Sequence, residues 1–276
     1  MNELLTDPAL QQLLDQSILL WALVAARLGP IVQLVPYMGG KAVPQMVKVA
    51  LTIALTVLIY PLVWSTDALS TLPSGALEIT ALLLKELLLG VMFGFVAALV
   101  FDAVRIAGQL IDNARGQTQA ISFAPQTPER VSVTGNYLYQ LAIVIFLSVG
   151  GHHLFITALV NSYAAIPPQQ FPDMGDHLPG LTLGIVRLAA DSITLGVLLA
   201  FPVIASLLLA DMCLALINKA APQINVFFLG MPIKALAGVA VVLFTLQTFA
   251  DRALDEAVEG IGFINAFLES VEREEP

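Results

Sequence analysis

ALEITALLLKELLLGVMFGFVAALVFDAVRIAGQLI, residues Ala76 to Ile111, is a long apolar block with few interruptions. A helix needs roughly 20 residues to cross a bilayer, so we expect a membrane-type helix here. Five further blocks have the same character: Ser17 to Val35, Val43 to Trp64, Asn136 to Ile166, Leu181 to Lys219 and Asn225 to Ala250. The fifth block in chain order is so long that Pro202 could divide it into two helices. The pattern predicts an all-α integral membrane protein.

The composition supports this class. Hydrophobic residues make up 58% of the chain and charged residues only 12%, against roughly 25% charged residues in soluble domains. The mean hydropathy is +0.85. A net charge of −9 argues against nucleic acid as a partner, because nucleic-acid binding needs a basic surface. The single cysteine, Cys213, excludes an intramolecular disulfide.

The acidic residues gather at the end of the chain. Eight acids and two arginines follow Ala250, so residues 251–276 carry −6 of the net charge. We expect two parts, an apolar helical domain over 1–250 and an acidic, solvent-exposed tail over 251–276. Acidic ends usually serve solubility, although apolar residues at helical spacing would also let the tail dock as an amphipathic helix. The spaced residues are Val258, Ile261, Ile264, Phe267, Leu268 and Val271.

A polar stretch, Asp112 to Gly135 (DNARGQTQAISFAPQTPERVSVTG), separates two of the apolar blocks. Lipid offers no hydrogen bonds to a backbone, so non-helical chain near membrane depth persists only inside protein or along a wet cavity. A polar stretch between two apolar helical blocks predicts a gated channel and does not indicate a catalytic site.

Ionisable residues interrupt the apolar blocks, and an isolated charge there costs about 2.5–3.5 kcal/mol on insertion scales. Asp102, Arg105, Gln109 and Asp112 follow one another at steps of three and four, which places them on one helical face. Arg187 and Asp191 repeat this pattern at i, i+4. These groups are either structural contacts between helices or the lining of an aqueous path. The predicted polar network is Asp102, Arg105, Gln109, Asp112, Arg115, Arg187, Asp191 and Asp211. Gly90 and Gly94 form a GxxxG step, typical of close helix packing.

Motifs of catalysis are missing. His152, His153 and His177 do not form a compact zinc-ligand pattern, and the sequence has neither GxxxxGK[ST] for phosphate binding nor a GxSxG elbow. We therefore expect no enzyme activity, no cofactor and no metal.

Several segments, in order along almost the whole chain, resemble the SctT/FliR family of type III secretion export-gate subunits. Each segment is modest alone, and their order and spacing together are specific. The matching segments are Gly108–Gly116 (GQLIDNARG), Phe146–His153 (FLSVGGHH), Asn161–Pro167 (NSYAAIP), Ala200–Pro202 (AFP), Leu207–Asp211 (LLLAD), Asn218–Asn225 (NKAAPQIN) and Phe228–Lys234 (FLGMPIK).

The resemblance implies helical hairpins that assemble into a hetero-oligomeric export gate in the bacterial inner membrane, within a secretion basal body. The implied partners are the small membrane subunits of the SctR/FliP and SctS/FliQ types, the SctU/FlhB-type switch protein, secreted unfolded proteins and the lipid bilayer. Within this family, Asp112–Gly116 is more similar to the injectisome branch and Ile121–Ala124 to the flagellar one. We favour the injectisome.

The resemblance also implies a plug loop that closes the channel, and we place it over residues 116–128. The implied plug residues are Gly116, Gln117, Thr118, Gln119, Ala120, Ile121, Ser122, Phe123, Ala124, Pro125, Gln126, Thr127 and Pro128. The alternative function is a self-contained secondary transporter for a small solute, with Asp102, Arg105, Arg187 and Asp191 at its binding site.

Overall fold

The protein is described by a computed structural model that covers residues 8–40, 43–64, 72–73, 75–116, 132–171 and 178–272. The helices are α2 (Pro8–Leu34), α3 (Pro36–Gly39), α4 (Gln45–Val63), α6 (Ala76–Ala114), α8 (Val133–Ser148), α9 (Gly151–Ala165), α10 (Leu178–Ala220) and α11 (Val226–Glu272). No strand occurs in these residues, which confirms the all-α prediction. Five of the helices are long and apolar enough to cross a membrane, or six if α8 and α9 are one broken span.

The chain divides into two compact units, and α6, α10 and α11 contribute to both. The first unit comprises Met1–Ala98, Gly150–Val186 and Glu259–Pro276, and the second comprises Leu99–Val149 and Arg187–Val258.

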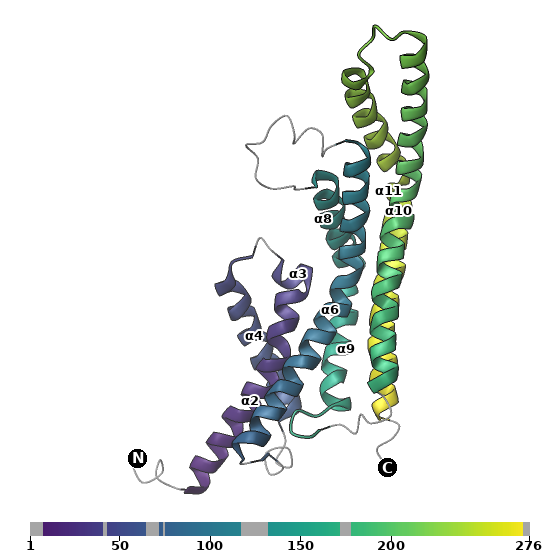
Figure 1. Cartoon of the computed structure of the whole chain (residues 1–276). Helices are drawn as coiled ribbons and strands as arrows, with labels where there is room; N and C mark the ends of the chain where they lie inside the picture. Colours follow the sequence, from purple (N-terminus) through teal and green to yellow (C-terminus); the bar gives the residue numbers. More distant parts are fainter. Residues whose placement is uncertain are drawn as a thin grey trace. The chain divides into compact units, whose positions relative to one another are not determined.

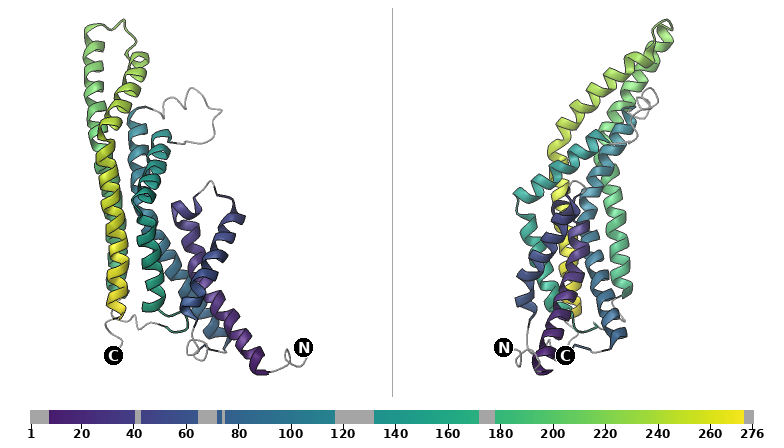
Figure 2. Two further views of the ribbon diagram at one scale, coloured as in Figure 1. Left: turned by 180° about the vertical axis from the view of Figure 1, so that it is seen from behind. Right: turned by 90° about the vertical axis from the view of Figure 1, so that its left-hand side faces the viewer.

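In the first unit, α2 leads through the short α3 into α4, and α2 packs against α4 (Figures 1 and 2). Pro36 occupies the first turn of α3, where the missing N–H costs nothing. Leu20 and Leu23 of α2 form a buried apolar cluster with Leu72 and Leu82. Burial of such side chains contributes about 1.5–3 kcal/mol each, so this cluster is one source of stability for the unit.

A buried ionic cluster lies in the same unit. The Arg27 guanidinium donates to both Glu86 carboxylate oxygens at 2.6 and 3.0 Å, and both side chains are 0% exposed. It also donates to the carbonyls of Ser162 and Ile166. The Lys85 ammonium lies 2.8 Å from the same carboxylate. Because bidentate pairing and carbonyl acceptors satisfy the guanidinium, the charges are tolerated in this apolar interior.

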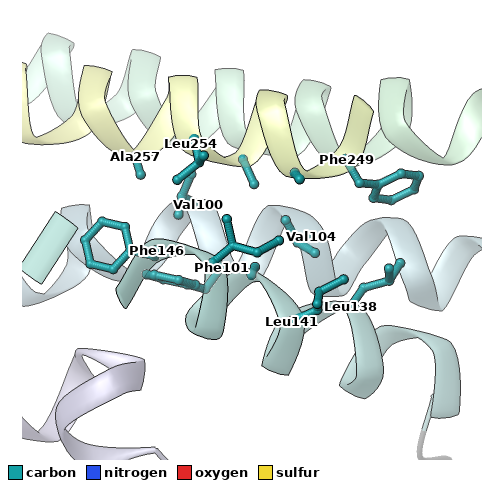
Figure 3. A pocket seen from close by; sticks show the side chains of 13 residues that line it. Val100, Phe101, Val104, Leu138, Leu141, Phe146, Phe249, Leu254 and Ala257 are labelled. Carbon is teal, nitrogen blue, oxygen red and sulfur yellow. The ribbon is translucent and has the colours of Figure 1, made fainter. Parts of the chain in front are cut away.

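The core of the second unit is aromatic and aliphatic. Phe101 of α6 meets Phe146 of α8 edge to face, with ring centroids 5.5 Å apart. Figure 3 shows Phe249, Leu254 and Ala257 of α11 facing this layer. The cavity between them measures about 20 Å³ and has apolar lining residues throughout. Such a space stays dry and is too small for an organic ligand.

Two breaks differ from the sequence-based expectation. The block Asn136–Ile166 was expected as one helix, but it is divided into α8 and α9 at Gly150, whose φ of 85° lies in the left-handed region that glycine adopts readily. The division of the fifth block at Pro202 is wrong, because α10 continues through this residue. A proline inside a helix removes one backbone hydrogen bond. α10 nevertheless stays helical at Pro202. It runs beside α11 (Figures 1 and 2).

The acidic end of the chain is not separate from the preceding helix. α11 runs from Val226 to Glu272 without interruption. Ala253 and Ala257 are buried within the second unit, and Ile261, Ile264 and Phe267 within the first. The acids Asp251, Asp255, Glu259 and Glu269 are exposed. Residues 251–272 thus continue the helix as an amphipathic segment whose spaced apolar side chains are buried, except Val258, which is 58% exposed.

Candidate functional site

The candidate site is the base of the predicted plug loop, where α6 ends and α8 begins. Of the predicted plug residues, only Gly116 belongs to the described part of the chain, and Gln117–Pro128 lie outside it. Gly116 follows the last turn of α6 with a φ of 87°, and its N–H donates to the carbonyl of Asn113 at 3.1 Å. A residue with a left-handed backbone ends the helix, and glycine adopts this conformation without the cost that other residues bear.

The Asp112 carboxylate joins the two ends of this segment. One of its oxygens accepts hydrogen bonds from the Ser132 hydroxyl at 2.7 Å and from the Thr134 N–H at 2.9 Å. The other accepts from the Thr134 hydroxyl at 2.6 Å. Asp112 is only 4% exposed. A buried carboxylate with three donors is well satisfied, and hydrogen bonds to an ionised acceptor are about twice as strong as neutral ones.

Ser132 also begins α8. Its hydroxyl accepts a hydrogen bond from the N–H of Gly135 at 2.8 Å, which satisfies one of the free donors at the start of a helix. The Asp112 carboxylate lies at the same helix end, where the helix dipole favours a negative charge. The residues at the start of α8 thus supply the hydrogen-bond donors for Asp112.

Arg115 extends the cluster to α11. Its guanidinium lies 3.4 Å from Asp112, donates to the Thr134 hydroxyl at 3.0 Å and donates to the backbone carbonyl of Ala235 at 3.1 Å. Gly238 of α11 leaves room for the stem of Arg115, because a Cβ there would lie 2.7 Å from the arginine Cδ. We call Asp112, Arg115, Ser132 and Thr134 the loop-base cluster. It joins α6, α8 and α11.

α6 and α8 pack closely next to the loop-base cluster. A Cβ at Gly108 would lie 2.3 Å from the Cα of Gly135, closer than real Cβ contacts allow. The backbones of α6 and α8 therefore touch at this point, one turn before Asp112. Side chains at either position would force the helices apart.

The comparisons with known proteins agree with this architecture. The family described as bacterial export proteins, family 1, matches residues 18–259. The chain belongs to this family. The match ends within α11, and it includes every described helix from α3 to α10 in full. The expected relationship to the export-gate proteins is thereby confirmed.

Relatives within this export family come from two kinds of system. The chain is 28% identical to the flagellar biosynthetic protein FliR of Pectobacterium carotovorum, over 88% of this chain and 92% of the relative. It is 31% identical to the Yop proteins translocation protein T of Yersinia pestis, over 78% and 82%. It is 28% identical to the surface presentation of antigens protein SpaR of Salmonella typhimurium, over 90% and 91%. These similarities do not separate the flagellar from the secretion branch.

The other residues of the predicted polar network lie outside the loop-base cluster. Asp102 and Arg105 approach to 3.4 Å, and the Arg105 guanidinium lies over the Tyr139 ring at 3.9 Å. Asp211 pairs with Lys234 at 2.6 Å. Gln109 is exposed. The structure thus brings Asp112 and Arg115 together, and it distributes the remaining groups along the surfaces of α6 and α10.

Arg187 and Asp191, expected as an i, i+4 pair, are both exposed on α10. Within the described residues no ion pair joins them. Both residues lie in a helix that is apolar enough to cross a membrane, where a charged side chain requires water or a protein partner.

Two members of the loop-base cluster were not identified from the sequence. Ser132 and Thr134 precede an apolar block, and a serine in that place is a recognised signal for the start of a helix. Their interaction with Asp112 spans about 20 residues of chain, so no local pattern reveals it. Among the described residues, no group of three His, Cys, Asp or Glu side chains could hold a metal ion.

Proposed function

We propose that this chain is a core subunit of the type III protein export gate and that residues 116–128 close the path taken by unfolded substrates. The observation that carries the proposal is the loop-base cluster, in which a buried aspartate holds both ends of this segment between long apolar helices. A polar loop with its two ends fixed in this way is positioned by a rigid scaffold, as functional loops commonly are.

The proposed action is passive gating. The substrate threads through the assembled subunits, movement of the plug opens the path, and a separate ATPase and the proton-motive force supply the energy. The ionic groups described above interact with one another and with backbone carbonyls. Their contacts suit a rigid scaffold at the base of the proposed plug.

Partner subunits are implied by the exposed apolar surface. On α4, Met46 is 86% exposed and Leu58 69%, and on α11 Phe244 is 89% exposed. Surfaces of this kind require lipid or another protein. We propose that SctR/FliP-type and SctS/FliQ-type subunits cover part of them, that an SctU/FlhB-type protein binds the assembly, and that the gate lies in the bacterial inner membrane.

Between the two branches we propose the injectisome, on the residues Asp112–Gly116. Restoration of export in an injectisome null strain, without restoration of motility in a flagellar null strain, supports this assignment. No structural observation favours the solute transporter, because two of its expected binding residues, Arg187 and Asp191, are exposed on the surface of α10.

The plug is tested by replacing Gln117–Ala124 with a glycine-serine segment of equal length in the co-assembled gate. We expect a constitutive leak of ions and small solutes, because Ile121 and Phe123 no longer seal the path. Membrane conductance and the assembly of the complex are measured together. The same replacement at residues 172–177 serves as the control and leaves the conductance unchanged. A fully assembled gate that stays tight without Gln117–Ala124 contradicts the proposal.

A further inference from the structure

A groove between α10 and α11 lies within the second unit and shares no lining residue with the loop-base cluster. It measures about 290 Å³, close to the lower limit of small-molecule pockets, which hold about 300–1,000 Å³. Leu195, Leu199 and Phe249 form its base, and each is buried. Leu198, which is 63% exposed, and the exposed Thr248 also line it. The groove is therefore apolar at its base and open at the protein surface.

One end of the groove carries a positive charge. Arg252 is the only charged residue among the described residues that line the groove, and it is exposed. Within the part of the chain that the structure describes, no ion pair joins Arg252 to an acid. An α-helix rises 1.5 Å per residue, so Arg252 lies about 10 Å along α11 from Thr245, which lines the other end. The groove thus combines an apolar length with one cationic end, as an amphiphilic ligand requires.

The cationic end coincides with the end of an uncharged stretch in both helices. Residues 192–210 of α10 and 235–250 of α11 include no charged residue. The Ser192 hydroxyl donates to the Glu256 carboxylate at 3.4 Å, so the charged ends of the two stretches lie side by side. Both helices are apolar enough to cross a membrane, and long basic side chains at such a boundary extend to the lipid headgroups. This register places Arg252 at headgroup level when the helices cross a bilayer.

We propose that this groove binds a zwitterionic phospholipid, with one acyl chain between α10 and α11 and the lipid phosphate at Arg252. A guanidinium binds phosphate through charge-assisted hydrogen bonds that are often bidentate. Asp255 and Glu256 follow Arg252 at i+3 and i+4, on the same helical face. Their carboxylates can accept hydrogen bonds from the ammonium of an ethanolamine headgroup, whereas they repel a headgroup with a net negative charge. This binding site goes beyond the proposed export function and does not depend on it.

The headgroup contact is tested on the full-length chain, purified in a mild detergent. Native mass spectrometry measures the binding of added phosphatidylethanolamine and of phosphatidylglycerol with the same acyl chains. We expect phosphatidylethanolamine to bind more tightly. Arg252→Gln is expected to weaken its binding roughly tenfold, since the loss of a charge-assisted hydrogen bond changes an equilibrium constant by about that factor. Tighter binding of phosphatidylglycerol overturns the proposal.

The matched control is Arg187→Gln, which makes the same change at an exposed arginine of α10 that does not line the groove. It is expected to bind phosphatidylethanolamine like the unmodified chain. Leu198→Trp fills the groove from an exposed position, and we expect it to lower the binding at least as much as Arg252→Gln. If the Arg252 and Arg187 variants bind the lipid equally well, the proposal is overturned. If Arg252→Gln does not fold, Leu198→Trp decides.

A second experiment distinguishes a lipid in the groove from a protein partner. A photoreactive phenylalanine analogue in place of Leu198 is activated by light in intact cells, and the products are identified by mass spectrometry. We expect a product whose mass exceeds that of the chain by one phospholipid. A crosslink to a protein without any lipid product overturns the proposal, and it leaves the proposed export function unaffected.

Discussion

Glu86→Gln is expected to destabilise the protein by about 3–5 kcal/mol, the usual cost of removing one partner from a buried ion pair. The substitution keeps the shape of the side chain and removes its charge. Arg27 is 0% exposed and pairs with both carboxylate oxygens, and Lys85 is 2.8 Å away. Arg27 then stays in the interior without a counter-charge, and Lys85 keeps only its backbone carbonyl acceptors. The free energy of unfolding of the purified protein, from a denaturing-detergent titration, measures the effect.

Asp191→Asn is the matched control for this variant. It makes the same carboxylate-to-amide change at an exposed position of α10, and surface changes of this kind usually stay within about 0.5 kcal/mol. The double variant Arg27→Met with Glu86→Gln is expected to lose less than the sum of its parts, because the uncompensated charge of Arg27 is gone. If Glu86→Gln unfolds like Asp191→Asn, the ionic cluster does not stabilise the first unit.

Gly90→Ala is the second substitution with a large expected effect. A Cβ at Gly90 would lie 2.2 Å from the carbonyl oxygen of Arg27, so α2 and α6 must move apart in the first unit. Overpacking usually costs about 1–3 kcal/mol and occasionally more. We expect the upper part of this range, because the obstacle is backbone and cannot turn away. The displacement also disturbs the Arg27–Glu86 pair, one turn from the contact.

The control for Gly90→Ala is Gly262→Ala. Gly262 lies inside α11, and a Cβ there has nothing within 4 Å. Alanine favours a helix over glycine by about 1 kcal/mol, so this variant is expected to be neutral or slightly more stable than the unmodified protein. The same titration measures both variants. Equal stability of the Gly90 and Gly262 variants would contradict the close approach of α2 and α6.

The helices were largely predictable, because an apolar block of this length is compatible with little else in a membrane. The residues at which the helices end or break were less predictable. Gly150 divides a block that contains no proline there, and Pro202 fails to divide one that does. Local propensity is a weak prior in both cases, since tertiary packing overrides it. The last apolar block was expected to end at Ala250, because the acidic composition of residues 251–276 favoured a solvent-exposed tail over the amphipathic helix that their apolar spacing also allowed.

The candidate site was predictable only in part. The spacing of Asp112 and Arg115 on one helix places them within reach of each other, and the structure puts them 3.4 Å apart. Their contacts with Ser132, Thr134 and Ala235 depend on how α6, α8 and α11 pack, which no periodicity in the chain encodes. The same holds for Arg27 and Glu86. Each was recognisable as a charge in an apolar block, but their pairing spans 59 positions of sequence.

We propose that residues 116–128 close the export path and that the loop-base cluster lies at their base. The most direct test is an electron cryo-microscopy map of the chain assembled with its two kinds of small membrane subunit. We predict density for residues 116–128 across the central path, with the Asp112, Ser132 and Thr134 side chains in contact at its base. A map in which this segment lies on the periphery, facing bulk solvent and away from any path, would contradict the account.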